Sequence, residues 1–155
     1  MIFERKVQFK PTSLKRHRFS RWGKHTYDPS SKDKKDFVNK IDNLPNKPFT
    51  GPLKAVLLFY EQRPKSHYRT GKYSHILKEK SPIYNTSKRD IDNFCKFVLD
   101  ALNKILYVDD SQIISLESKK YYTKNRDEGY IHIKFTEIKK KEDKNEDKHL
   151  DILTQ

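Results

Sequence analysis

The sequence predicts an α+β fold with about four strands and two main helices. Some segments repeat apolar residues at every second position, as strands do, and others at every third or fourth position, as helices do. The segments expected to form strands are residues 3–9, 53–60, 113–122 and 129–135. The segments expected to form helices are residues 28–41 and 90–106.

The four strand segments differ in how apolar they are. Residues 3–9 alternate imperfectly between apolar and polar side chains, which indicates a short strand. Residues 53–60 are mostly apolar, so this strand is expected at the centre of the sheet with both faces buried. Residues 129–135 alternate cleanly and are expected to pair with residues 113–122 as an antiparallel hairpin.

The second helix has the strongest helical pattern in the chain. Its apolar residues follow the spacing of one buried face, at Ile91, Phe94, Cys95, Val98, Leu102, Ile105 and Leu106. The first helix is expected to begin at Asp28-Pro29-Ser30-Ser31, because proline suits a first helical turn. Residues 10–27, between the first strand and the first helix, show no regular spacing of apolar residues and are interpreted as a loop. Residues 61–89 are unusually long for a loop, which favours a functional or disordered segment.

Length and composition narrow the class of protein. The chain has 155 residues and fits one domain, expected over residues 1–138, with a charged, mobile tail over residues 139–155. Its one cysteine, Cys95, excludes an intrachain disulfide and is expected to be buried. No apolar run approaches the roughly 18 residues that span a bilayer, and no signal peptide is evident. The sequence therefore predicts a cytoplasmic protein without a membrane segment.

Positive charge is concentrated in two segments. The formal net charge is +13. Residues 1–40 carry 12 Lys or Arg against 4 Asp or Glu, and residues 63–89 carry 8 against 1. Such segments favour the phosphate backbone of nucleic acid, without reading its sequence. The residues expected to contact DNA are Lys15, Arg16, Arg18, Arg21, Lys24, Arg63, Lys65, Arg69, Lys72 and Arg89.

Aromatic residues accompany the first basic segment. Phe19 and Trp22 can stack on bases at an opened branch point. The alternative is a solvated loop in which Trp22 is partly buried in the core. For the second segment the alternative is a flexible loop without a partner.

Two acidic pairs, Asp90 with Asp92 and Asp109 with Asp110, lie in this basic chain. A divalent metal held by their oxygens would offset their repulsion of a phosphate backbone. Asp90 and Asp92 can converge only if Asp90 lies at or before the start of the helix, because two residues of one regular helix point about 200° apart. Lys96, one turn after Asp92, can pair with a carboxylate or meet a phosphate. The alternative is that Asp90 caps the helix and that Asp109-Asp110 forms an ordinary turn.

Three ordered motifs resemble the RusA-type Holliday junction resolvases. They are Arg89-Asp90-Ile91-Asp92-Asn93-Phe94-Cys95-Lys96, Leu99-Asp100-Ala101-Leu102-Asn103 and Asp109-Asp110-Ser111-Gln112-Ile113. The resemblance extends over roughly residues 5–135, and the tail has no counterpart in it.

The resemblance implies a specific activity. RusA-like enzymes are small homodimeric α+β endonucleases with a mixed sheet, and they cut four-way DNA junctions with paired nicks in recombination and repair. By similarity, Asp90, Asp92 and Asp110 are the expected ligands of Mg²⁺, with Mn²⁺ as the alternative metal. Asp109 is then a supporting acid and Lys96 the essential lysine, whereas Asp100 is interpreted as structural.

Two other functions compete with the nuclease. One is a non-catalytic nucleic-acid-binding protein whose acids are helix caps, and the other is a basic structural protein of a nucleoprotein assembly. Only the nuclease is expected to cut branched DNA, and only its carboxylates need to converge.

Overall fold

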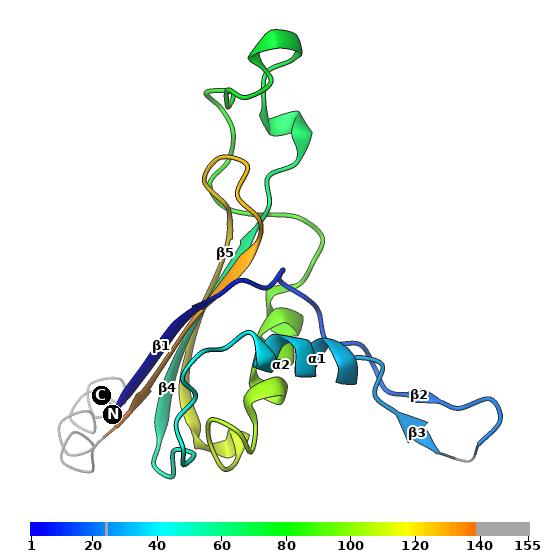
Figure 1. The fold of residues 1–155 in the computed structure, drawn as a ribbon, viewed down its shortest axis with the longest axis vertical. Coiled ribbons are helices and arrows are strands. Elements are labelled where there is room, and N and C mark those ends of the chain that lie inside the picture. The colour runs from blue at the N-terminus through cyan, green and yellow to red at the C-terminus, as the bar shows by residue number, and fades with distance from the viewer. Residues whose placement is uncertain (24, 139–155) are drawn as a thin grey trace, which may run out of the picture.

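The computed structural model describes residues 1–23 and 25–138, so the expected tail lies outside the described residues. Its main sheet has four strands, and two helices lie against one face of it (Figure 1). The strands are β1 (Ile2–Val7), β4 (Leu53–Glu61), β5 (Ile113–Tyr122) and β6 (Tyr130–Glu137). The helices are α1 (Ser31–Asn39) and α2 (Ile91–Leu102). The α+β fold expected from the sequence is confirmed.

The order of the strands is β1-β6-β4-β5, which makes the sheet mixed. β6 is antiparallel to both β1 and β4, while β5 is parallel to β4. The expected hairpin between residues 113–122 and 129–135 is therefore wrong, because β4 lies between them. The most apolar strand takes the centre, where both neighbours satisfy its backbone groups. The polar β5 takes the edge of the sheet, where its charged side chains reach water.

β4 is central, as expected, but only one of its faces is fully buried. Its residues alternate along the strand between buried and half-buried. The buried side chains, Leu53, Ala55, Leu57 and Phe59, belong to the core between sheet and helices. On the open face, the Tyr60 ring stacks between Tyr130 and Tyr121, with centroids 4.3 and 5.1 Å away. This row of rings covers part of the face that no helix covers.

The core is largely aromatic. The rings of Phe37 from α1 and Phe97 from α2 meet at 5.9 Å, and Phe94 lies 5.2 Å from Phe59 of β4. Each of these four side chains is almost completely buried. Burying one such ring contributes about 1.5–3 kcal/mol, so this cluster fixes both helices on the sheet.

α2 begins where the sequence analysis expects and ends sooner. Asp90 is its N-cap, with extended backbone, and Leu102 is its last residue instead of Leu106. Lys104 follows with a positive φ of 64°, which interrupts the helix and lets Leu106 turn back into the core. Cys95 is buried, as expected, and burial raises the pKa of its thiol.

Residues 10–27 contain a short hairpin where a loop was expected. It pairs β2 (Arg18–Phe19) with β3 (Thr26–Tyr27) and extends away from the domain (Figure 1). Strands of two residues are too short to produce a detectable alternation. Trp22 lies beyond β2 and is 98% exposed, so the alternative that buries it in the core is wrong.

Residues 62–82 form an arm that extends past the end of the sheet, and residues 83–89 return beside β5 to the start of α2 (Figure 1). The arm contains two short 3₁₀ helices, η1 (Lys65–His67) and η2 (Gly71–Tyr73). Its buried Tyr68 donates from its hydroxyl to the backbone oxygen of Asn125, in the connection between β5 and β6. The arm is therefore anchored to the body of the domain. Among the described helices, none is long and apolar enough to cross a membrane.

Candidate active site and nucleic-acid interface

Asp90 lies at the start of α2, in the one place that allows it to converge with Asp92. Its backbone is extended at the N-cap, and its exposed carboxylate makes no capping hydrogen bond. The alternative of a simple side-chain cap is therefore not seen. Within the described residues, this carboxylate has no hydrogen bond or ion pair, although it lies beside the N–H groups of a helix N-terminus.

Asp92 follows in the first turn of α2 and pairs with Lys96. The ammonium of Lys96 lies 3.1 Å from a carboxylate oxygen of Asp92, one helical turn away. This hydrogen bond lowers the pKa of Asp92. Both side chains are exposed, so a lysine and a carboxylate are presented together near the N-terminus of α2.

Asp109 and Asp110 begin η3 (Asp110–Gln112), the short 3₁₀ helix before β5. The Asp109 carboxylate accepts from the N–H of Ser111 at 2.9 Å, and the Gln112 side chain accepts from the N–H of Asp109 at 2.9 Å. Hydrogen bonds from the side chain and the N–H of Ser111 lower the pKa of the Asp109 carboxyl. Asp109 therefore has the local capping role of the alternative interpretation, whereas Asp110 is exposed and makes no such bond.

Tyr107 connects η3 to α2. Its hydroxyl donates to the backbone oxygen of Leu99, and its ring is fully buried. Burial raises the pKa of Tyr107, and the negative charges of Asp110 and Asp100 raise it further. The Asp110 carboxylate therefore lies on the same side of the domain as the C-terminal end of α2.

The four carboxylates are of the type that binds magnesium, but their positions do not form a magnesium site. Magnesium prefers hard oxygen ligands that converge on one point. Across residues 1–23 and 25–138, no three His, Cys, Asp or Glu side chains gather closely enough to hold a metal ion. Asp92 is occupied by Lys96 and Asp109 by its capping bond. The expected convergence is not seen here, and the role of these acids as ligands stays a prediction.

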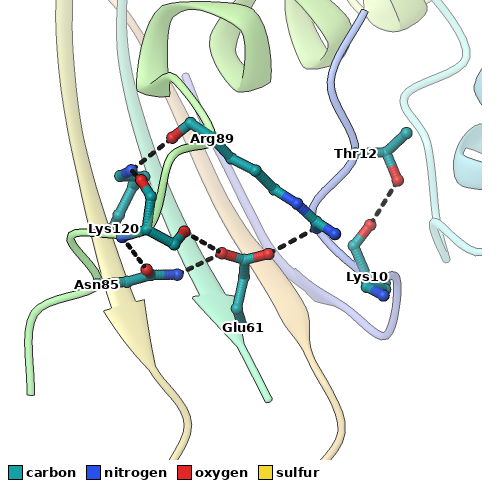
Figure 2. Close-up of polar contacts among 7 residues, drawn as sticks. Lys10, Thr12, Glu61, Asn85, Arg89 and Lys120 are labelled. Atoms are coloured by element: carbon teal, nitrogen blue, oxygen red, sulfur yellow. Dashed lines mark hydrogen bonds and ion pairs between the residues drawn. The ribbon is translucent and has the colours of Figure 1, made fainter. Parts of the chain in front are cut away.

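A buried carboxylate fixes the segment that leads into α2. Glu61, the last residue of β4, is only 9% exposed. It accepts from the Arg89 guanidinium at 2.7 Å, from the Asn85 amide, and from the Ser87 hydroxyl at 3.4 Å (Figure 2). Lys120 of β5 adds bonds to the backbone oxygens of Ser87 and Arg89. Residues 85–89 are thus tied to two strands immediately before Asp90.

The basic residues expected to contact DNA fall into two groups. In the first segment, Lys15 pairs with Asp33 at 3.3 Å. Arg16, Arg18 and Arg21 are exposed on or beside the β2–β3 hairpin. Lys24 lies outside the described residues.

The cations of the arm have unequal roles. Lys65, Arg69 and Lys72 are exposed. Arg63 instead donates to the backbone oxygens of Thr123 and Pro82, each at 2.7 Å, and so holds the base of the arm. Its guanidinium is engaged in structure before any ligand arrives.

Asp100 has a structural role, as expected. Lys34 of α1 bridges Asp28 and Asp100 and so connects the two helices. Burial alone would raise the pKa of Asp28, but its hydrogen bonds with Lys34 and the Ser30 N–H lower it. Burial alone would lower the pKa of Lys34, but its bonds to Asp100 and Asp28 raise it. The contacts therefore outweigh the cost of partial burial.

Removal of this bridge is expected to destabilise the domain. We expect Lys34→Met to lower the free energy of unfolding by about 1–2 kcal/mol at neutral pH, because two acids lose their shared cation. The lowered pKa of Asp28 means that its contribution is complete above the ordinary carboxyl pKa and is lost as pH falls through the folded pKa. Urea unfolding should therefore show a constant gap from wild type down to about pH 5 and a narrowing gap below about pH 4.

The matched control is Lys32→Met, since Lys32 is an exposed residue of the same helix. It should stay within about 0.5 kcal/mol of wild type. Equal stability of the two variants would show that the bridge contributes nothing.

The comparisons with known proteins identify the family. The family model of endodeoxyribonuclease RusA matches residues 8–134. This chain belongs to the RusA endodeoxyribonuclease family. It is also 37% identical over 102 residues to the uncharacterized protein YqaN of Bacillus subtilis (strain 168), covering 64% of this chain and 71% of YqaN. The resemblance inferred from the three motifs is thus confirmed, and all of them lie within the RusA match.

The sequence analysis did not single out several residues of this region. Glu61, Asn85 and Lys120 hold the entry to α2, Lys10 lines a cavity beside it, and Arg126 lines the cavity of the arm. One signal was available for Glu61, because it is the lone acid at the end of the most apolar strand, directly before a basic segment. The others look like ordinary surface residues in the sequence.

Proposed function

We propose that this protein is a magnesium-dependent endodeoxyribonuclease that resolves four-way DNA junctions by paired symmetric nicks. Membership of the RusA endodeoxyribonuclease family supports nuclease activity. The observation that carries the proposal is the exposed Asp90 carboxylate, which has no bond to any described residue and lies at the start of α2 beside Asp92 and Lys96. A carboxylate without a partner on so basic a chain is available to a cation.

The proposed roles follow from the chemistry of each side chain. Asp90, Asp92 and Asp110 are the proposed ligands, with Asp109 supporting them. Magnesium, or manganese in its place, would lower the pKa of a bound water and neutralise charge on the phosphate. Lys96 stabilises negative charge that develops on the same phosphate. The N–H groups at the start of α2 favour an approaching phosphate.

A homodimer is part of this proposal. A four-way junction has approximate two-fold symmetry, and paired nicks require two active sites in one complex. The protein is then placed in DNA recombination and repair, with branched DNA as its partner.

A non-catalytic DNA-binding protein is the second candidate. The capping bond of Asp109 to Ser111 favours it, since that acid already has a structural role. Both candidates bind DNA, so only cleavage separates them.

The test is incubation with labelled four-way junction, linear duplex and flap DNA, with and without Mg²⁺. We expect symmetric nicks in the junction alone and only when Mg²⁺ is present. Binding without cleavage of any substrate, with either Mg²⁺ or Mn²⁺, would support the second candidate.

A further inference from the structure

Three neighbouring cavities connect the arm to the start of α2. The arm cavity, of about 620 Å³, shares Gln62, Arg63 and Lys65 with a second cavity of about 440 Å³. The second shares Lys10 and Arg89 with a third, of about 330 Å³, which continues to Lys15. Because each cavity shares lining residues with the next, the three lie side by side in a row, which we call the track.

The lining of the track is strongly positive. Its cations are Lys10, Lys15, Arg63, Lys65, Arg69, Arg89 and Arg126. Glu61 is the one acid among the described residues that line it, and Arg89 already neutralises that carboxylate at 2.7 Å. The net charge of the lining therefore favours a polyanion along its whole length.

Two kinds of cation line the track. Arg63 and Arg126 are fixed, since Arg63 holds two backbone oxygens and Arg126 stacks 5.3 Å from Tyr68 while donating to Ser74. Lys10, Lys65 and Arg69 have no side-chain hydrogen bond or ion pair within the described residues. Lys15 and Arg89 are paired with Asp33 and Glu61. The fixed cations shape the wall, and Lys10, Lys65 and Arg69 are available to a ligand.

The track passes the residue that precedes Asp90. Figure 2 shows the Arg89 side chain reaching between Glu61 and the Lys10–Thr12 segment, where the second and third cavities meet. The next residue after Arg89 is Asp90, the N-cap of α2. A chain of phosphates that follows the track therefore passes close to Asp90.

We propose that the track binds the phosphate backbone of one unpaired DNA strand and leads it past Asp90. Each cavity has the size of a site for a small ligand or a single nucleotide, whereas a duplex is far wider. A positive groove that follows the backbone is the general way to hold a single strand without reading its sequence. This inference rests on the proposed function, because it assigns the path of a substrate strand in that enzyme.

The test compares two double variants of the full chain that lose equal charge. Lys65→Ala with Arg69→Ala removes two free cations of the track, and Lys32→Ala with Lys47→Ala removes two exposed lysines elsewhere. The probe is fluorescein-labelled (dT)20 without divalent metal, titrated at several salt concentrations beside a linear duplex. The single variant Lys10→Ala probes the other end of the track independently.

We expect the track variant to bind (dT)20 about tenfold more weakly, with a salt dependence that is shallower by about 1.4 in log–log slope for two lost contacts. Lys10→Ala should reduce the slope by about 0.7. The control and the duplex should change little. The proposal is overturned if wild type does not bind (dT)20, if the track variants behave as the control does, or if duplex binding weakens equally.

Cleavage of the junction by wild type with Mg²⁺ is measured separately. If wild type cleaves and the track variants bind as the control does, the strand path is wrong and the nuclease remains. If the track variants lose (dT)20 binding but wild type cuts no substrate, the strand path remains and the nuclease is wrong.

Discussion

Asp90→Asn is expected to abolish metal-dependent cleavage of a four-way junction while the protein still binds it. Asparagine keeps the size of the side chain but removes the charge that a cation requires. The change also breaks no hydrogen bond or ion pair among the described residues, so folding should be unaffected. Loss of a residue that only orients a metal ligand already costs about 10–100-fold, so loss of a direct ligand should reduce the cleavage rate by more than about 100-fold.

Single-turnover cleavage and gel-shift binding, measured on the same preparations, separate the two effects. The matched control is Asp36→Asn, since Asp36 is an exposed acid of α1 away from the motifs. This control should cut at the wild-type rate. Wild-type cleavage by Asp90→Asn would remove Asp90 from the proposed active site.

Glu61→Ala is expected to have the second largest effect. Glu61 accepts hydrogen bonds from Arg89, Asn85 and Ser87, and it is the only link between those side chains and β4 that the described contacts provide. Their loss should lower the free energy of unfolding by about 2–3 kcal/mol, at roughly 1 kcal/mol for each bond. It should also lower the cleavage rate by more than about tenfold, because the backbone before Asp90 is then held by β5 alone.

Stability and positioning can be separated by comparison with Lys34→Met. That variant loses similar stability at the far side of α2 but leaves Glu61 and Arg89 in place. Both proteins are assayed well below their melting temperatures, with rate and substrate affinity measured separately. If Glu61→Ala cuts no more slowly than Lys34→Met, Glu61 serves stability alone.

The sequence predicted local structure better than it predicted pairing. The helical period of residues 90–106 depends only on neighbours along the chain, so the start of α2 and its buried face were predictable. The partner of β5 was not predictable, because β4 lies more than fifty residues before it in the sequence. β4 takes the place beside β5 that the sequence analysis gave to β6. A hairpin between the consecutive strands β5 and β6 was the simplest interpretation. The more apolar β4 instead lies between them, where it is buried.

In the candidate site, too, the local motif was predictable and the long-range contacts were not. Asp90, Asp92 and Lys96 belong to one local motif, and their placement at the start of α2 was predictable. Glu61 acts through contacts 24–28 residues along the chain, which no local pattern reveals. The alternative interpretation gave the cap to Asp90 and a turn to Asp109-Asp110, whereas Asp109 is the residue whose side chain caps a helix.

The pairing of β1 with β6 constrains how the protein can be made. Ile2 lies opposite Thr136, so β1 meets its partner only after the rest of the described domain has been synthesised. Until then the buried side of β1, including Val7, has no neighbouring strand and is exposed to other nascent chains. Completion of the sheet must therefore wait for the synthesis of β6.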